Sequence, residues 1–131
     1  MTIKSMLAVA GLFTACLAPI VVAPAVAHHS FGHYDMTKVS EIEGTVHRYE
    51  WSNPHCWLFV DVTSADGTPV TYGFELSSVG EMLRRGWKKT TVRYGEKIKV
   101  KYRPMVDGTP AGLLVSAERD GTALGDGRAL R

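Results

Sequence analysis

Hydrophobic and polar residues alternate with a two-residue period in three stretches of this chain, and two further stretches are short runs rich in apolar and β-branched residues. The alternation is the pattern of β-strands that bury one face and solvate the other. The stretches cover residues 39–51, 57–63, 68–76, 97–103 and 113–118. The first strand is expected to bend at Gly44, because a glycine inside a strand often marks a bend or a bulge.

Turn residues separate these stretches, and one helical segment interrupts the strand pattern. Asn-Pro at 53–54 and Asp-Gly at 66–67 are turn sequences. Between the third and fourth stretches, the apolar residues change to a spacing of three and four. That spacing predicts a helix of about two turns, capped by a serine at 77 or 78 and stopped at Gly86.

Five strands with one helix between the third and fourth predict an all-β domain, a five-stranded OB-like Greek-key barrel. An open five-stranded sheet covered by one helix is the alternative. The barrel domain is expected to occupy residues 39–120, after an extended N-terminal arm at 28–38 and before a flexible tail at 121–131. The fold by itself does not predict a function.

The first 27 residues have the pattern of a secretory signal peptide. Lys4 precedes an apolar run, and Ala25 and Ala27 fit the small-x-small rule for cleavage after Ala27. Two prolines break the apolar run, which is shorter than the roughly 20 apolar residues of a membrane-spanning helix. We therefore expect a periplasmic or secreted bacterial protein with no stable membrane span after cleavage. Cleavage after Ala25, or lipidation at Cys16, is the alternative.

Composition and charge indicate which classes of binding partner are expected. Of the 131 residues, 45% are hydrophobic and 21% are charged, which is ordinary for one globular domain. Cleavage would leave Cys56 as the sole cysteine, so no internal disulfide is expected. The formal net charge is +2, with both signs interspersed. This pattern does not predict a nucleic-acid partner or a polybasic membrane surface.

Three short motifs resemble those of a family of small exported bacterial proteins of unknown function. They are His28-His29-Ser30-Phe31, Trp51-Ser52-Asn53-Pro54-His55 and Arg84-Arg85-Gly86-Trp87. The resemblance covers nearly all of the mature chain and implies an exported β-barrel domain with a paired-histidine start. It implies no activity. His33 and Cys56 lie outside the shared pattern.

The predicted N-terminus suggests a copper site. Cleavage after Ala27 would give His28 a free α-amine beside its imidazole, a nitrogen pair that resembles the histidine brace of copper proteins. Nitrogen donors in tetragonal geometry favour Cu(II). His55 is the expected third ligand, and His29 and His33 are further candidates. The arm from residue 28 to residue 38 could extend about 36 Å, far enough to reach the loop that carries His55.

The loop before the second strand suggests a different function. Tyr49, Trp51, Asn53 and Trp57 gather around one turn, and aromatic side chains beside a turn are suited to docking a periplasmic protein or a glycan. In this alternative the protein is a non-catalytic binding module. For either function, Cys56 in the same loop could be a soft Cu(I) ligand, although a lone cysteine after a turn is more often a small buried hydrophobe.

No catalytic constellation is evident in the sequence. A Gly-x-Ser-x-Gly elbow, a glycine-rich phosphate loop and carboxylates paired on one face are all missing. We therefore do not predict an enzyme.

Overall fold

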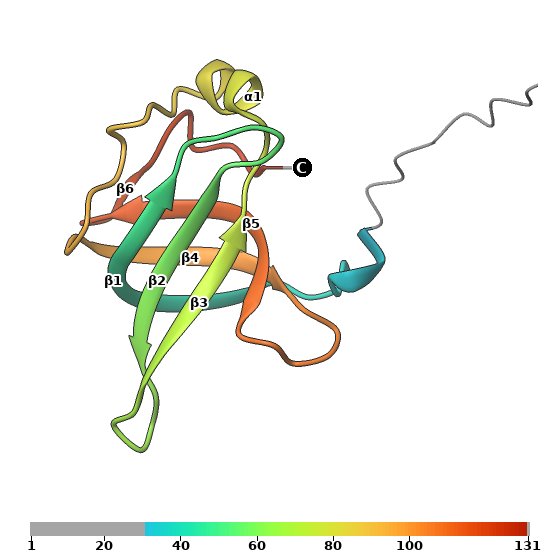
Figure 1. Cartoon of the computed structure of the whole chain (residues 1–131), viewed down its shortest axis with the longest axis vertical. Coiled ribbons are helices and arrows are strands. Elements are labelled where there is room, and N and C mark those ends of the chain that lie inside the picture. Colours follow the sequence, from blue (N-terminus) through green and yellow to red (C-terminus); the bar gives the residue numbers. More distant parts are fainter. Residues whose placement is uncertain (1–30, 131) are drawn as a thin grey trace, which may run out of the picture.

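The computed structural model describes residues 31–130, which fold into a closed five-stranded β-barrel with one short helix (Figure 1). A 3-10 turn precedes the barrel, and the helix lies between the third and fourth strands along the chain. The elements are η1 Phe31–His33, β1 Ser40–Glu50, β2 Trp57–Thr63, β3 Pro69–Glu75, α1 Val79–Arg84, β4 Lys97–Pro104, β5 Ala111–Arg119 and β6 Thr122–Ala123.

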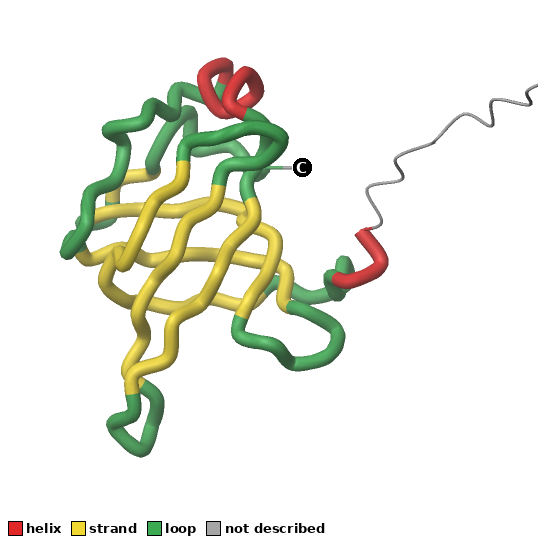
Figure 2. Tube along the Cα trace, in the orientation of Figure 1, coloured by secondary structure: helices red, strands yellow, loops and turns green. Residues whose placement is uncertain are grey.

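Pairing between β3 and β5 closes the barrel. β1 pairs antiparallel with both β2 and β4, and the hairpins β2–β3 and β4–β5 are also antiparallel. The closing contact is parallel and joins Gly73–Glu75 to Ala111–Leu113. Figure 2 shows the first three strands crossing over the last two. The prediction of five strands and a barrel is therefore confirmed, and the open sheet is wrong.

β1 changes its pairing partner next to Gly44, because residues 40–45 pair with β4 and residues 45–50 pair with β2. A Cβ atom on Gly44 would lie 2.4 Å from the carbonyl oxygen of Asp61, so only glycine fits where the strands approach this closely. Beyond Gly44, the pairing with β2 skips His47. Such a bulge reverses the inside-outside alternation, and it turns Tyr49 towards the core. Without the bulge, strand alternation would place Tyr49 on the outer face.

The core fills the barrel with side chains from every strand of the closed sheet and from the helix. Met82 is the fully buried residue of α1, and Trp87 and Val92 extend the core beyond that helix. The largest fully buried side chains are Phe74, Leu58, Leu76, Met82, Leu114, Val46, Val60, Val100 and Cys56.

The segment from residue 121 to residue 130, which the composition predicts to be a flexible tail, packs on the barrel in the structure. Leu124 and Leu130 are buried, and the backbone N–H of Leu130 donates to the carbonyl of Val115 at 2.7 Å. The Arg85 guanidinium donates to the carbonyl of Ala129 at 3.1 Å. The apolar contacts of this segment come from two leucines, which are too few to be recognised in a glycine-rich composition.

The predicted signal peptide, its cleavage site and both histidines at 28 and 29 lie outside the described residues. Within residues 31–130, no helix is long and apolar enough to cross a membrane.

Candidate functional site

The Asn-Pro-His loop is tied to the segment that joins β3 to α1. The amide N–H of Val79 donates to the Asn53 side-chain oxygen at 3.0 Å, so Asn53 satisfies a donor at the start of α1. The N–H of Cys56 donates to the carbonyl of Ser77 at 3.0 Å, and Leu76 donates back to Cys56 at 2.9 Å. These bonds hold the loop in one position beside the end of β3.

His55 is oriented by a carboxylate at the end of β3. Its Nδ1 lies 2.7 Å from Oε1 of Glu75, and the two side chains are only 25% and 20% exposed. When the imidazole is neutral and Nδ1 donates this bond, Nε2 carries the lone pair. A histidine with one nitrogen on a carboxylate is the arrangement that commonly orients metal-binding imidazoles.

The same carboxylate holds the N-terminal arm. The Tyr34 hydroxyl donates a hydrogen bond to Oε2 of Glu75. Burial, followed by the hydrogen bond to Glu75, raises the pKa of Tyr34 far above its ordinary value. The phenol therefore stays protonated and remains a donor. Glu75 thus joins the arm, the loop and β3, and we define Tyr34, His55 and Glu75 as the carboxylate-centred triad.

Sequence reasoning identified His55 but not Glu75 or Tyr34. Glu75 looks like an ordinary polar residue at a strand end, and 41 positions separate it from Tyr34. The usable signal was the β2–β3 register. In a hairpin closed at residues 66–67, Glu75 comes opposite Trp57, beside the loop.

Among residues 31–130, His33 is the one other predicted histidine ligand, and it does not form a metal-binding group with His55. The backbone of His33 accepts from Val106 at 2.9 Å, which places η1 beside the β4–β5 connection. His47, which was not a predicted ligand, pairs with Asp61 at 2.9 Å. Within residues 31–130, no group of three or more His, Cys, Asp or Glu side chains is arranged to hold a metal ion. His28 and His29 are not among these residues.

Tyr49 and Trp51 pack against the core. Their rings lie 5.8 Å apart, and Tyr49 is also 6.3 Å from Trp87. Burial raises the pKa of Tyr49, and its hydroxyl is buried without a hydrogen-bond partner among the described residues. These two aromatic residues close one end of the core.

Trp57 instead belongs to a strip on the outer face of β2. It stacks on Phe59 with the ring centroids 6.2 Å apart, and the Arg48 guanidinium lies 4.3 Å above the Phe59 ring. Phe59 covers Gly73, where a Cβ atom would come within 3.3 Å of the ring. Phe59 and Arg48 were not predicted as site residues, although their outward positions follow from strand alternation and the bulge in β1.

Cys56 is a core residue. It is fully buried, and burial raises the pKa of its thiol. Its Sγ lies 3.7 Å from the carbonyl oxygen of Ser52. A protonated, enclosed thiol favours the interpretation of Cys56 as a small hydrophobe over a Cu(I) ligand.

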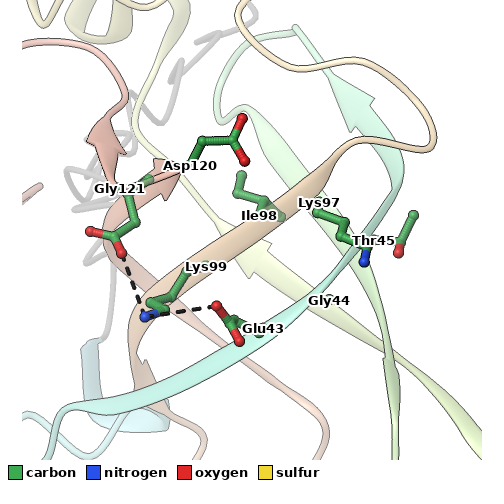
Figure 3. A pocket seen from close by; sticks show the side chains of 9 residues that line it. Glu43, Gly44, Thr45, Lys97, Ile98, Lys99, Asp120 and Gly121 are labelled. Atoms are coloured by element: carbon green, nitrogen blue, oxygen red, sulfur yellow. Dashed lines mark ion pairs between the residues drawn. The ribbon is translucent and has the colours of Figure 1, made fainter.

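A depression of about 560 Å³ lies where β1 bends across β4 and β5 (Figure 3). Lys99 lies in it, with its Nζ 3.6–3.7 Å from Glu43, Glu118 and Glu41. These carboxylates raise the pKa of Lys99. None of the predicted ligands or docking residues lines this depression, and its central cation is already surrounded by carboxylates.

Comparison with known proteins gives a family but no activity. The model of DUF6152, a family of unknown function, matches residues 16–116. The chain belongs to this family. No curated protein and no solved structure matches the chain. Membership of this family assigns no activity to the chain.

The Tyr34 hydrogen bond can be tested by stability. We expect Tyr34→Phe to lower the free energy of unfolding by about 1–2 kcal/mol, because the half-buried carboxylate of Glu75 loses one of its donors. Tyr94→Phe is the matched control, because Tyr94 is 82% exposed and its change should cost less than about 0.5 kcal/mol. Denaturant unfolding of both variants measures the difference. Equal stabilities would mean that Tyr34 does not anchor the arm.

Proposed function

We propose that the protein is an exported domain that binds copper(II) through the amine and imidazole of His28 together with His55. The observation that carries the proposal is the contact of 2.7 Å between His55 and Glu75. It fixes the imidazole plane and, in the neutral ring, favours Nε2 as the metal-binding nitrogen. The outer carboxylate also increases the basicity of a metal-bound histidine.

The anchoring of Tyr34 makes this ligand set geometrically reasonable. Tyr34 bonds to the same carboxylate as His55, and it lies six positions after His28 along the chain, with η1 in between. Six positions span at most about 20 Å even when extended, and the 3-10 turn shortens this distance, so the predicted N-terminus stays near the residue that shares Glu75 with His55. His29 and His33 are further donors for a site of this kind. Tyr34 itself is not proposed as a ligand, because its raised pKa keeps it protonated.

Copper(II) is favoured by the donors and by the proposed compartment. An α-amine has an ordinary pKa of about 7.7–8.0, so it loses its proton to a metal at modest cost. Two imidazoles and one amine form a nitrogen-rich set, which suits the tetragonal geometry of Cu(II). Export is proposed from the signal sequence, and it would produce this terminus only through cleavage after Ala27.

Replacement of His55 tests the proposed ligand. We expect His55→Ala to weaken Cu(II) binding by at least about a hundredfold, and Glu75→Gln to weaken it by about tenfold, as is common for outer partners of ligands. His47→Ala is the control, because His47 is also paired with a carboxylate and yet is not part of the triad. Calorimetric titration of the folded proteins measures the three affinities. A His55→Ala protein with wild-type affinity would exclude His55 as a ligand.

A second candidate function is docking of a protein or glycan partner. The Trp57–Phe59 strip, with Arg48 above it, supports this candidate better than Tyr49 and Trp51, which pack on the core. Aromatic faces contribute large contact area at small entropic cost. A chelator separates the two functions. A partner that binds at the Trp57–Phe59 strip should stay bound when chelator is added, and its binding should be lost in the Trp57→Ala variant.

We further infer that the barrel has OB-like Greek-key topology. Supporting this, the closed order is β1–β2–β3–β5–β4 and back to β1, with β3–β5 as the parallel contact. The position of α1 between β3 and β4 also fits. An experimental structure in which β3 and β5 do not pair would contradict this inference.

A further inference from the structure

The unpaired cations of the described chain are concentrated in one loop. We define the basic loop as residues 88–97, which follow α1 and end at Lys97, the first residue of β4. Its cations Lys88, Lys89, Arg93 and Lys97 are exposed, and their side chains make no ion pair or hydrogen bond within the described residues. Every other lysine and arginine of residues 31–130 has a partner: Lys38, Arg48, Arg84, Arg85, Lys99, Lys101, Arg103, Arg119 and Arg128.

The one acid of the loop is shared between a cation of β5 and Arg93 of the loop itself. Glu96, which is the one carboxylate of the loop, accepts a hydrogen bond from Arg119 of β5 at 2.8 Å. It also accepts the backbone N–H of Arg93 at 3.0 Å. Because Glu96 is paired with Arg119 from outside the loop and interacts only in part with Arg93, the loop keeps an excess of positive charge, carried mainly by Lys88, Lys89 and Lys97. The near-neutral charge of the whole chain conceals this local excess.

The loop backbone is fixed by the core. Trp87 and Val92 are buried, and the N–H of Lys88 donates to the Thr91 hydroxyl at 2.7 Å. Arg119 also donates to the Thr91 carbonyl at 3.2 Å. Between these anchors, the side chain of Tyr94 is 82% exposed, more than any other large hydrophobic side chain of the described chain. The arrangement presents one aromatic ring among cations on a fixed support.

We propose that the basic loop docks the protein on an anionic phospholipid bilayer, with Tyr94 at the headgroup level. Lysine and arginine attract anionic headgroups, and tyrosine favours the interface because its ring is apolar and its hydroxyl is polar. Whole-chain charge did not predict this surface, since it depends on which cations are paired. The loop lies on the opposite side of the barrel from η1 (Figure 1).

Co-sedimentation with vesicles tests the docking. The exported protein should bind vesicles of phosphatidylcholine with 30% phosphatidylglycerol in 0.1 M salt, but not vesicles of phosphatidylcholine alone. Each cation near an anionic surface multiplies the partition coefficient by about five, so Lys88→Gln with Lys89→Gln should lower it by about 25-fold. Tyr94→Ala should lower it by about fivefold, and Tyr94→Phe should retain binding.

The control removes two paired cations from elsewhere. Lys38→Gln with Lys101→Gln subtracts the same charge from residues that pair with Asp35 and Glu41. It should lower the partition coefficient much less than the loop double variant. All variants share one N-terminus, so residues before Phe31 contribute equally. Equal loss in both double variants, unchanged binding of Tyr94→Ala, or equal binding to neutral vesicles would overturn the proposal. So would tight binding of duplex DNA without vesicle binding, which would indicate a nucleic-acid partner.

Discussion

One extra residue before His28 is expected to weaken Cu(II) binding by about a hundredfold or more, equivalent to about 2.7 kcal/mol. The extension converts the terminal amine into an amide, whose nitrogen has no available lone pair at neutral pH. The imidazole of His28 and the triad are unchanged in composition. The loss would therefore measure the contribution of the amine and of the chelate ring that it closes with its own imidazole.

The comparison needs two proteins that differ only at this end. One begins at His28 and the other carries a single glycine before it. Their melting temperatures without metal should agree, because the added residue changes no contact within residues 31–130. One equivalent of copper should raise the melting temperature of the first protein and have little effect on the second, since a ligand stabilises the state that it binds. Equal copper affinities would exclude the terminal amine as a ligand.

Gly125→Ala is expected to lower the free energy of unfolding by about 3 kcal/mol. Gly125 has φ of 70°, and a Cβ atom there would lie 2.4 Å from the Trp87 ring and 2.5 Å from the carbonyl oxygen of Arg85. The left-handed backbone costs an alanine about 1–2 kcal/mol, and displacement of a buried indole adds about 1–3 kcal/mol. For a barrel of this size, the melting temperature should fall by roughly 15 °C.

Gly121→Ala is the matched control for this effect. Gly121 has φ of 75°, but no atom lies within 4 Å of the position of its added Cβ. The backbone term alone predicts a loss of about 1–2 kcal/mol. If thermal melting shows the same loss in both variants, the C-terminal segment does not pack against Trp87 in solution.

The strands could be predicted from the sequence because their alternation reflects a barrel with one buried face. The helix could be predicted because the apolar residues around Met82 recur at helical spacing, which places Met82 on the side of the helix that faces the core. The bulge at His47 could not, since one inserted residue looks like ordinary polar sequence until its partner strand is known. That single residue moved Tyr49 from the outer face to the core.

The candidate site was only partly predictable. The Asn-Pro-His loop stands out by composition, and His55 is indeed oriented by a neighbour. Glu75 and Tyr34 come close to His55 only because segments distant in sequence pair with each other. Such pairing cannot be predicted from the local sequence pattern. The basic loop was missed for a related reason, because ion pairing decides which of many cations are left available.

The packed C-terminal segment shows where composition misleads. Glycine-rich sequence predicts disorder when no apolar contact is known, yet Leu124 and Leu130 are buried against the barrel. Arg85 also fixes this segment, since its carbonyl accepts the N–H of Asp126 at 2.7 Å. Two short apolar contacts and a few backbone hydrogen bonds are sufficient to order a segment that lacks any periodic pattern.

The most direct test of the proposed function is a Cu(II) titration of the protein purified after bacterial expression of the full sequence, once its first residue has been determined by peptide sequencing. We expect the chain to begin at His28 and to bind one equivalent of Cu(II), with a sharp calorimetric endpoint. A chain that begins at His28 and shows no copper-binding heat would contradict the copper proposal itself, because every proposed donor would then be present.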